Sequence, residues 1–372
     1  MNISALPNKK NFKAGHDIKI EDLKKLDLGD IIKRKVFDVK SNSIKNFKNK
    51  CVLITGGAGS IGSEISEQIL KSKPRKLIII DNSEYSLFKI KNKLGSSKNI
   101  KYILLDINNQ KYLTKIIKEN NITYIFHAAA YKHVSILEDN LISAVKNNIC
   151  ATHSLLKSIE NTNINLTIIS TDKAVEPINI LGMTKRASEM ISLAISRRKG
   201  YEKSNISIVR FGNVFGSAGS AVEVFKNQIL NNLPVTLTDA KMSRYFMSIR
   251  EACNLVLQVS QFKNPNSIFI LKMGKPIKIL DLIKHMFNLL KTDSQKLKIK
   301  VIGKFKSEKI NEKLSTNKLY KTKVKDISFV KEKVLNPKVV EIFLSDIDKS
   351  LNYLDDRNTL KILKKFIYLN EH

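Results

Sequence analysis

The chain has 372 residues, of which 42% are hydrophobic and 27% charged, a composition typical of a globular protein with a sizeable core. No apolar run reaches the roughly 18 residues that a membrane span needs, and the N-terminal stretch lacks the apolar core of a secretory signal. Cys51, Cys150 and Cys253 lie far apart in apolar stretches, which indicates neither a disulfide framework nor a metal site. We therefore expect a cytoplasmic protein with no integral membrane segment and no metal.

The formal net charge of +31 raises the question of a nucleic-acid or membrane-surface partner. The lysines are scattered, however, and form neither a dense basic block nor a motif with aromatic residues for base stacking. We therefore expect no nucleic-acid partner. A positive field would still favour the approach of an anionic ligand.

Short apolar runs alternate with helical patterns from residue 50 onward, after a polar, lysine-rich N-terminal arm over residues 1–48. Such alternation is typical of a doubly wound parallel sheet in an α/β protein. The apolar runs expected to form its first strands cover residues 51–55, 77–80, 102–105, 123–126, 166–169 and 206–209.

The order becomes less regular after Asn213, where the pattern predicts a helix over 249–262, a strand over 267–271 and helices over 279–290 and 358–369. We expect a larger domain made of residues 49–212 and 244–273. A smaller, interleaved C-terminal lobe would bind the substrate and consist of residues 213–243 and 274–345. Residues 346–372 would form a C-terminal helical tail.

A glycine-rich segment, residues 56–62, lies between the first predicted strand and the first predicted helix. Small residues let the backbone approach a pyrophosphate, and the helix N-terminus adds N–H donors and positive potential. The strand–turn–helix context predicts a Rossmann-like domain that binds a dinucleotide. The residues expected to contact the cofactor here are Gly56, Gly59, Ser60, Ile61 and Gly62.

Asp81 ends the second apolar run, nineteen positions after Gly62. A carboxylate at this position can bind both ribose hydroxyls of NAD and would repel the additional phosphate of NADP, so we expect NAD rather than NADP. The alternative is a solvated aspartate at a strand end. Analogy with the fold adds Asp106 and Ile107 beside the adenine, and Ala128, Ala129 and Ala130 packed along the cofactor.

A second motif follows the fifth run: STDKAV at residues 170–175, then GMTKR at residues 182–186. This string resembles the active-site segment of the nucleotide-sugar 4,6-dehydratases of bacterial polysaccharide biosynthesis (the CapD/WbpM/PglF-like group), which are extended short-chain dehydrogenases/reductases. Matching segments run in order from about residue 50 to residue 290: GGAGSIGSE, DNSEYSL, FHAAAYKHV, STDKAVEPIN, TKRASEM, VRFGNVFGSAGS, SRYFMSIREA and ILKMGKP.

The resemblance implies a lyase that uses NAD without net redox change. Hydride leaves sugar C4, a base removes the C5 proton, an acid helps the C6 hydroxyl to leave, and the hydride returns to C6. It implies Asp172 as the acid, Lys173 as the base and Thr171 as a neighbour that hydrogen-bonds the sugar. Lys185, the lysine of the general dehydrogenase signature, is expected to serve both the cofactor and catalysis.

Leu181 departs from that general signature, which has a tyrosine four positions before the lysine. A leucine cannot accept the proton of the C4 hydroxyl. One interpretation is a silent protein that binds a nucleotide-linked sugar. The other is a branch of the dehydratases that carries methionine there, for which leucine is a similar apolar shape. The intact Asp172–Lys173 pair favours the second interpretation, in which Asp172 itself would accept the C4 proton.

The resemblance also implies a UDP-sugar substrate, most simply UDP-N-acetylglucosamine, and a homo-oligomer whose helices near residues 145–158 and 187–198 are candidate interface faces. A 4-epimerase is the alternative enzyme, although it would need another group in place of the tyrosine.

The loop that in this family reads RPGEK is FKSEK here, at residues 305–309. The chain would be the catalytic unit alone. The expected substrate contacts are Lys132, His133, Asn213, Arg244 and Glu308.

Overall fold

The computed structural model describes residues 46–262, 267–290 and 296–368, so the expected N-terminal arm lies almost wholly outside the described residues. The chain divides into two compact units. The larger unit contains Lys40–Phe211, Ala252–Lys272 and Lys313–His372, and the smaller one contains Gly212–Glu251 and Met273–Glu312. No helix in the described ranges is long and apolar enough to cross a membrane.

A nine-stranded sheet forms the centre of the larger unit, in the order β14-β15-β11-β6-β5-β4-β1-β2-β3. The strands from β3 to β11 pair in parallel, and β15 is antiparallel to both of its neighbours. This confirms the expected doubly wound, Rossmann-like sheet. The strands are β1 (Cys51–Thr55), β2 (Lys76–Asp81), β3 (Ile100–Leu104), β4 (Tyr124–His127), β5 (Asn165–Ile169), β6 (Asn205–Arg210), β11 (Ser267–Leu271), β14 (Tyr320–Lys321) and β15 (Ile327–Val330).

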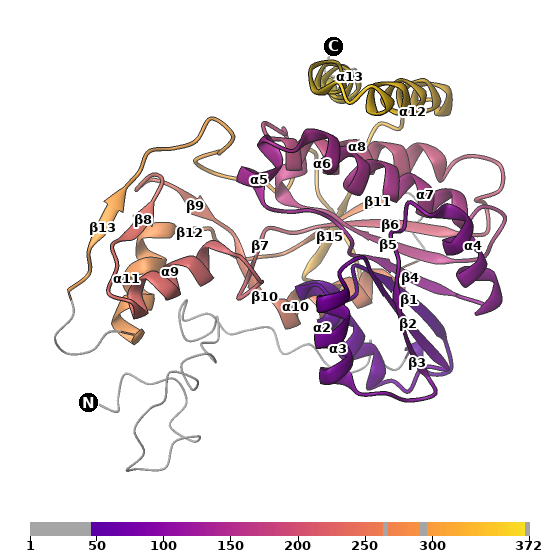
Figure 1. Ribbon diagram of the computed structural model, residues 1–372, viewed down its shortest axis with the longest axis horizontal. Coiled ribbons are helices and arrows are strands. Elements are labelled where there is room, and N and C mark those ends of the chain that lie inside the picture. Colours follow the sequence, from indigo (N-terminus) through magenta and orange to yellow (C-terminus); the bar gives the residue numbers. More distant parts are fainter. Residues whose placement is uncertain (1–45, 263–266, 291–295, 369–372) are drawn as a thin grey trace. The chain divides into compact units, whose positions relative to one another are not determined.

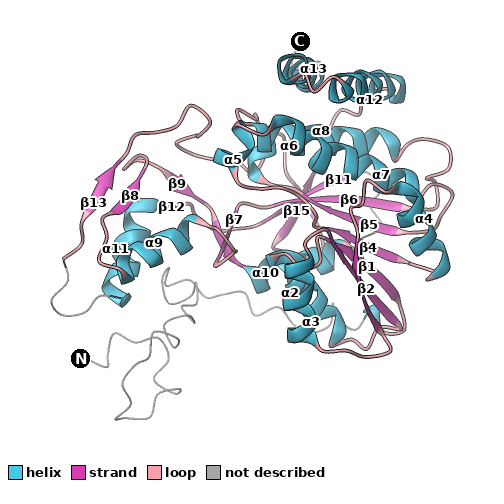
Figure 2. Cartoon of the chain, in the orientation of Figure 1, coloured by secondary structure: helices cyan, strands magenta, loops and turns pink. Residues whose placement is uncertain are grey.

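Helices cover both faces of this sheet, as right-handed crossovers between parallel strands require (Figures 1 and 2). One face carries α2 (Ser60–Leu70), α3 (Glu84–Leu94) and α10 (Ile249–Val259). The thiol of Cys253 in α10 donates to the carbonyl of Ile61 in α2. The other face carries α4 (Gln110–Glu119), α5 (Val134–Glu138), α6 (Leu141–Val145), the π-helix Lys146–Cys150, α7 (Ala151–Ser158) and α8 (Ile180–Ile195).

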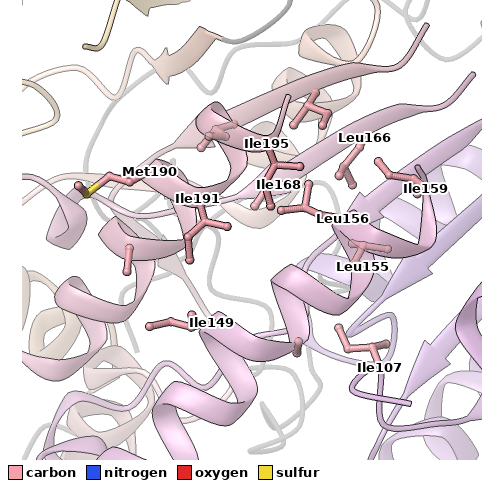
Figure 3. Packing of buried hydrophobic residues seen from close by; sticks show 14 of the residues in the cluster. Ile107, Ile149, Leu155, Leu156, Ile159, Leu166, Ile168, Met190, Ile191 and Ile195 are labelled. Atoms are coloured by element: carbon pink, nitrogen blue, oxygen red, sulfur yellow. The ribbon is translucent and has the colours of Figure 1, made fainter. Parts of the chain in front are cut away.

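The apolar core lies between β4–β6 and the helices α7 and α8 (Figure 3). Every residue of α8 except Arg186 is buried. The outer side of α8 is covered by α12 (Pro337–Asn352) and α13 (Asp356–Tyr368), in which the rings of Phe343 and Phe366 stack 3.8 Å apart. Helices of the same chain therefore cover one side of α8, which includes most of the candidate interface segment 187–198.

Residues 313–345 differ from the expected organisation, because they join the larger unit rather than the smaller lobe. The physical reason is edge pairing: β15 hydrogen-bonds antiparallel to β11, and Ile327 and Val330 are buried there. Residues 244–251, expected in the larger domain, lie in the smaller unit, where β10 pairs with β7.

Within the described ranges, the smaller unit contains three two-stranded sheets and two helices, α9 (Ala221–Leu230) and α11 (Ile279–Leu290). The two helices pack on each other through an apolar cluster that includes Phe225, Ile229 and Ile283. Its paired strands are β7 (Asn213–Phe215) with β10 (Phe246–Ser248), β9 (Ser243–Arg244) with β12 (Ile277–Lys278), and β8 (Val235–Leu237) with β13 (Ile299–Val301).

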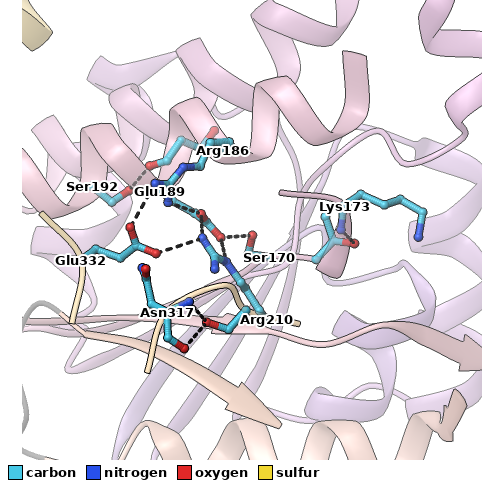
Figure 4. Close-up of polar contacts among 11 residues, drawn as sticks. Ser170, Lys173, Arg186, Glu189, Ser192, Arg210, Asn317 and Glu332 are labelled. Atoms are coloured by element: carbon cyan, nitrogen blue, oxygen red, sulfur yellow. Dashed lines mark hydrogen bonds and ion pairs between the residues drawn. The ribbon is translucent and has the colours of Figure 1, made fainter. Parts of the chain in front are cut away.

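Four buried or partly buried charged side chains connect the end of the sheet to α8 (Figure 4). The Glu189 carboxylate accepts two hydrogen bonds from Arg210, at 2.7 and 2.6 Å, and one from the Ser170 hydroxyl at 2.7 Å. Arg186 lies between Glu189, at 3.3 Å, and Glu332, at 3.0 Å. The network therefore joins β6, α8, the segment after β15, and the residue that follows β5.

This network is balanced in charge, with two arginines and two glutamates. Burial alone would raise the pKa of the Glu189 carboxyl, but Arg210, Arg186 and the Ser170 hydroxyl outweigh burial and hold that pKa below its ordinary value. Glu189 is consequently a carboxylate at neutral pH, and its ion pairs compensate the loss of hydration.

We predict that Glu189→Ala lowers the free energy of unfolding by about 3–5 kcal/mol, because it leaves Arg210 buried without its carboxylate partner. Glu119→Ala is the matched control, since the Glu119–Lys115 pair lies on the surface of α4 and should contribute less than about 1 kcal/mol. Urea unfolding followed by circular dichroism measures both. Equal, small losses for the two variants would contradict the structural role of the network.

Candidate active site

The strand order reverses between β1 and β4, and a pocket opens where the carboxyl ends of these strands diverge. Doubly wound sheets bind ligands at this switch point. The pocket has a volume of about 190 Å³. Its walls include the predicted cofactor residues Gly56, Gly59, Asp81, Asp106, Ile107, Ala128, Ala129 and Ala130, together with Asn82, Ser86, Tyr131 and Asn147, which the sequence analysis did not single out.

Two glycines of the first motif occupy positions that no other residue fits. Gly56 has φ +61°, and a Cβ there would lie 2.5 Å from the Cα of Ala129. A Cβ at Gly62 would lie 2.3 Å from the Gly56 carbonyl oxygen. The turn is therefore closed tightly against the residues that follow β4, and α2 begins directly after it with Gly59 as a cap that has no side chain. Bare backbone at a helix N-terminus fits a pyrophosphate, as the motif predicts.

Backbone N–H groups orient the carboxylate of Asp81. Its Oδ2 accepts from Ala58 and its Oδ1 from Ser83, both at 3.0 Å. Each oxygen keeps a further lone pair, so the group can still accept two ribose hydroxyls. Asp106 is exposed, and its Oδ1 accepts from the backbone and the side chain of Asn108 at 2.9 Å. These residues fit a dinucleotide with its ribose at the end of β2.

The segment after β5 forms a short 3₁₀ helix, Asp172–Ala174. Asp172 is fully buried, and its Oδ1 accepts from the Thr171 hydroxyl at 2.9 Å and from the Lys173 ammonium at 3.0 Å. Its Oδ2 is buried as well and has no hydrogen-bond partner among the described residues. A buried carboxylate oxygen without a partner is rare, and here it could exchange a proton with a bound ligand.

Helix α8 begins against this segment. A Cβ at Gly182 would lie 2.2 Å from the Lys173 carbonyl oxygen, so only glycine permits the contact. The side chain of Asn179 caps the helix by accepting from the Gly182 N–H at 2.7 Å. Lys185 follows one turn later and is buried. Burial lowers the pKa of its ammonium to about 8, although Glu189 opposes that shift.

His127 lies at the end of β4 and is buried. Its Nδ1 lies 2.7 Å from the Thr55 hydroxyl and its Nε2 lies 3.0 Å from the Thr152 hydroxyl. Because Thr152 donates its proton to the Asn148 carbonyl, Nε2–H must be the donor and Nδ1 the acceptor. Burial, and then the charge of Lys185, lower the pKa of His127 to about 3, so the ring is neutral.

Asn148 belongs to the π-helix and was not anticipated. Its amide accepts from the Tyr131 N–H at 2.9 Å, and donates to the Tyr131 carbonyl and to the Thr184 hydroxyl, each at 3.1 Å. It thus fixes the pocket wall after β4 to the helix that carries Lys185. A π-helical turn often marks a functional site, but the spacing of apolar residues gave no signal of it.

Leu181 is buried and belongs to the apolar cluster beneath α8. An apolar residue therefore fits this position.

Lys132 and His133 are exposed in the segment between the pocket wall and α5. The imidazole of His133 is nevertheless partly desolvated, and this, followed by the charge of Lys132, lowers its pKa.

The other three expected substrate residues lie in the smaller unit. The Arg244 guanidinium donates to the carbonyls of Ser243, Lys309 and Ile310 at 2.7–2.9 Å, so it holds the chain next to Glu308. Glu308 has a buried Oε2 with no hydrogen-bond partner in the described ranges. Asn213 begins β7, and its N–H donates to the Tyr245 carbonyl.

Curated relatives include both dehydratases and epimerases of nucleotide sugars. The chain is 35% identical over 92% of its length to the capsular polysaccharide biosynthesis protein CapD of Staphylococcus aureus, of which the match covers 57%. It is 31% identical to a UDP-N-acetylglucosamine 4,6-dehydratase (inverting) of Campylobacter jejuni, covering 72% of this chain and 77% of that protein. It is 32% identical to a UDP-glucose 4-epimerase of Rickettsia bellii, covering 72% and 78%. The chain thus spans little more than half the length of CapD.

Solved structures agree with the fold. Pen from Bacillus thuringiensis superimposes with a TM-score of 0.72 at 33% identity, covering 78% of this chain and 92% of Pen. DesIV, a dTDP-glucose 4,6-dehydratase from Streptomyces venezuelae, superimposes with a TM-score of 0.64 at 19% identity, covering 71% of this chain and 88% of DesIV.

A family model described as "Polysaccharide biosynthesis protein" matches residues 52–332, which include the pocket, the Asp172–Lys173 segment and the smaller unit. This match and the relatives confirm the resemblance indicated by the motifs. The chain belongs to the polysaccharide biosynthesis protein family, among whose relatives are nucleotide-sugar dehydratases and epimerases.

Proposed function

We propose that the chain is an NAD-dependent 4,6-dehydratase that converts UDP-N-acetylglucosamine to a UDP-4-keto-6-deoxy-N-acetylhexosamine for surface polysaccharide synthesis. The observation that carries this proposal is the pair formed by the buried Asp172 and the partly buried Lys173, joined by a 3.0 Å hydrogen bond. The pair follows β5, and the pocket wall Ala128–Ala130 follows the neighbouring parallel strand β4. The carboxyl ends of adjacent parallel strands share one edge of the sheet, so acid, base and cofactor pocket belong to the same edge.

NAD bound in the pocket would supply a reversible hydride acceptor for the oxidation of sugar C4 and the later reduction of C6. Gly56, Gly59 and the first turn of α2 would hold its pyrophosphate, and Asp81 its ribose. Lys185 would approach the nicotinamide ribose from α8. Ala128–Ala130 would exclude water from one side of the cofactor.

In the active form, Lys173 would have released its proton, so that Asp172 is a carboxylate and Lys173 a free amine and neither group carries a transferable proton. Asp172 accepts the C4 hydroxyl proton as C4 is oxidised, and Lys173 then accepts the C5 proton, which the C4 ketone has acidified. Asp172 donates its proton to the C6 oxygen, which leaves as water. Lys173 returns its proton to C5 as C6 is reduced, so both residues regain their starting state.

Leu181 supports this assignment of protons. The leucine side chain is buried in the apolar cluster and offers no group that accepts the C4 proton. Asp172 Oδ2, which has no partner among the described residues, has the lone pairs for that proton. An epimerase also oxidises C4, and the Rickettsia relative bears that name, but an epimerase has no use for an acid–base pair directed at C5 and C6.

Incubation of the native protein with UDP-N-acetylglucosamine and NAD⁺, followed by mass spectrometry of the nucleotide sugar, tests the proposal. We expect a product that has lost one water. A new isobaric sugar would mean an epimerase, and unchanged substrate that nevertheless binds would mean a silent binding protein. Either of these results would overturn the proposed function.

The carboxylate of Asp81 should make the protein prefer NAD⁺ to NADP⁺, because it would repel the additional ribose phosphate. We expect kcat/KM with NAD⁺ to exceed that with NADP⁺ by at least about tenfold, which is a modest effect for repulsion between a carboxylate and a phosphate. Asp81→Ala should reduce this ratio of the two kcat/KM values. Equal use of both cofactors by the native protein would refute the role given to Asp81.

Removing the amine of Lys173 should stop the reaction after C4 oxidation, because C5 would keep its proton. Lys173→Met should therefore accumulate bound NADH, visible by its absorbance, and release no dehydrated product. Asp172→Asn should lower kcat by about 10²–10⁴-fold, the usual contribution of general acid–base catalysis.

Lys203→Met, at an exposed lysine, is the control and should retain native activity. Near-native release of dehydrated sugar by Lys173→Met would show that the base is another residue.

A further inference from the structure

The loop Val175–Asn179 connects the Asp172–Lys173 segment to α8 and contains a strained residue. Glu176 has φ +45°, in the left-handed region that residues with a side chain rarely adopt. Pro177, the next residue, is buried, and Asn179 caps α8. A strained conformation persists only where the surrounding structure holds it. The contacts of this loop therefore determine where the catalytic segment and the start of α8 lie.

Two of the loop's contacts come from the C-terminal part of the chain. The hydroxyl of Tyr368, the last residue of α13, donates to the Pro177 carbonyl at 2.9 Å, across 191 positions of sequence. The ammonium of Lys313 lies 3.1 Å from the Glu176 carboxylate. Glu138 in α5 holds the start of α8 directly after the loop, where its carboxylate accepts from the Ile180 N–H at 2.9 Å.

The helix pair α12–α13 gives Tyr368 a rigid support. Val340, Phe343 and Ile347 of α12, and Leu363 and Phe366 of α13, belong to the same buried apolar cluster as α8. Figure 1 shows the two helices side by side next to α8. The tyrosine is thus fixed relative to the helix whose first turn presses on the Lys173 carbonyl at Gly182.

We infer that α12–α13 is a clamp that holds the loop Val175–Asn179 in its strained conformation, and that Tyr368 is a positioning residue for the Asp172–Lys173 pair. The inference rests on the proposed dehydratase function. Asp172 and Lys173 are held within the same tight turn, in which the Val175 N–H donates to the Asp172 carbonyl. Relaxation of Glu176 and Pro177 would therefore shift the two reacting groups. A shift of well under 1 Å is enough to lower the rate without changing how substrate or cofactor binds.

Tyr368→Phe tests the clamp, because it removes only the hydroxyl that reaches Pro177 and keeps the ring. We expect kcat for dehydration to fall by roughly three- to tenfold, with KM for the UDP-sugar and Kd for NAD⁺ unchanged. Tyr353→Phe is the matched control, since Tyr353 lies on the same helix pair, at the end of α12, with 84% of its surface exposed. It should leave kcat unchanged.

Hydrogen–deuterium exchange of the amides in residues 174–182 tests the clamp without any assay of activity. These amides should exchange faster in Tyr368→Phe than in the native protein or in Tyr353→Phe, while the amides of α7 and β6 should exchange at native rates. Native exchange in this loop would overturn the inference, and so would a fall in kcat accompanied by an equal change in KM. If the native protein dehydrates no sugar, the proposed function fails, and the exchange result alone then decides whether the clamp exists.

Discussion

The buried carboxylate of Glu189 constrains the edge of the larger unit to which the proposed catalytic residues belong. It accepts hydrogen bonds from Arg210 at the end of β6 and from Ser170 directly after β5, while itself belonging to α8. A charge in an apolar interior is stable only when its partners stay in place. The ends of two neighbouring strands and one helix are therefore held together at the point where Thr171, Asp172 and Lys173 begin, and Glu332 extends the same network to the C-terminal segment.

The chemistry proposed for this edge depends on the protonation states and charges of its buried side chains. His127 is neutral because it is buried and lies near Lys185, whose own pKa is lowered to about 8 by burial. Asp172 has its charge compensated by Lys173 on one oxygen and has no partner for the other among the described residues. One oxygen of Asp172 is thus paired with a cation, while the other is left for a proton that the sugar would exchange. Such an arrangement suits acid–base chemistry on two adjacent carbons without a tyrosine.

The parts of this molecule that depend on local pattern could be predicted from the sequence. Strands β1 to β6 are short apolar runs between helical patterns. The glycines at positions 56 and 62 could be predicted to lie where the backbone comes close to other backbone and leaves no room for a Cβ. The parts that depend on distant contacts could not. Residues 320–330 complete the sheet only because β11 offers an open edge, and the Tyr368 hydroxyl meets Pro177 through packing of α13 on α8. The π-helical turn at Asn148 likewise leaves the spacing of apolar residues unchanged.

The relatives include dehydratases and epimerases of nucleotide sugars, and the fate of one hydrogen separates these two reactions. UDP-N-acetylglucosamine carrying deuterium at C4 should give a product with deuterium in the C6 methyl group, as nuclear magnetic resonance or tandem mass spectrometry can detect. That transfer requires oxidation at C4, loss of the C6 hydroxyl and return of the same hydride. Deuterium that stays on C4, in unchanged sugar or in a 4-epimer, would contradict the account.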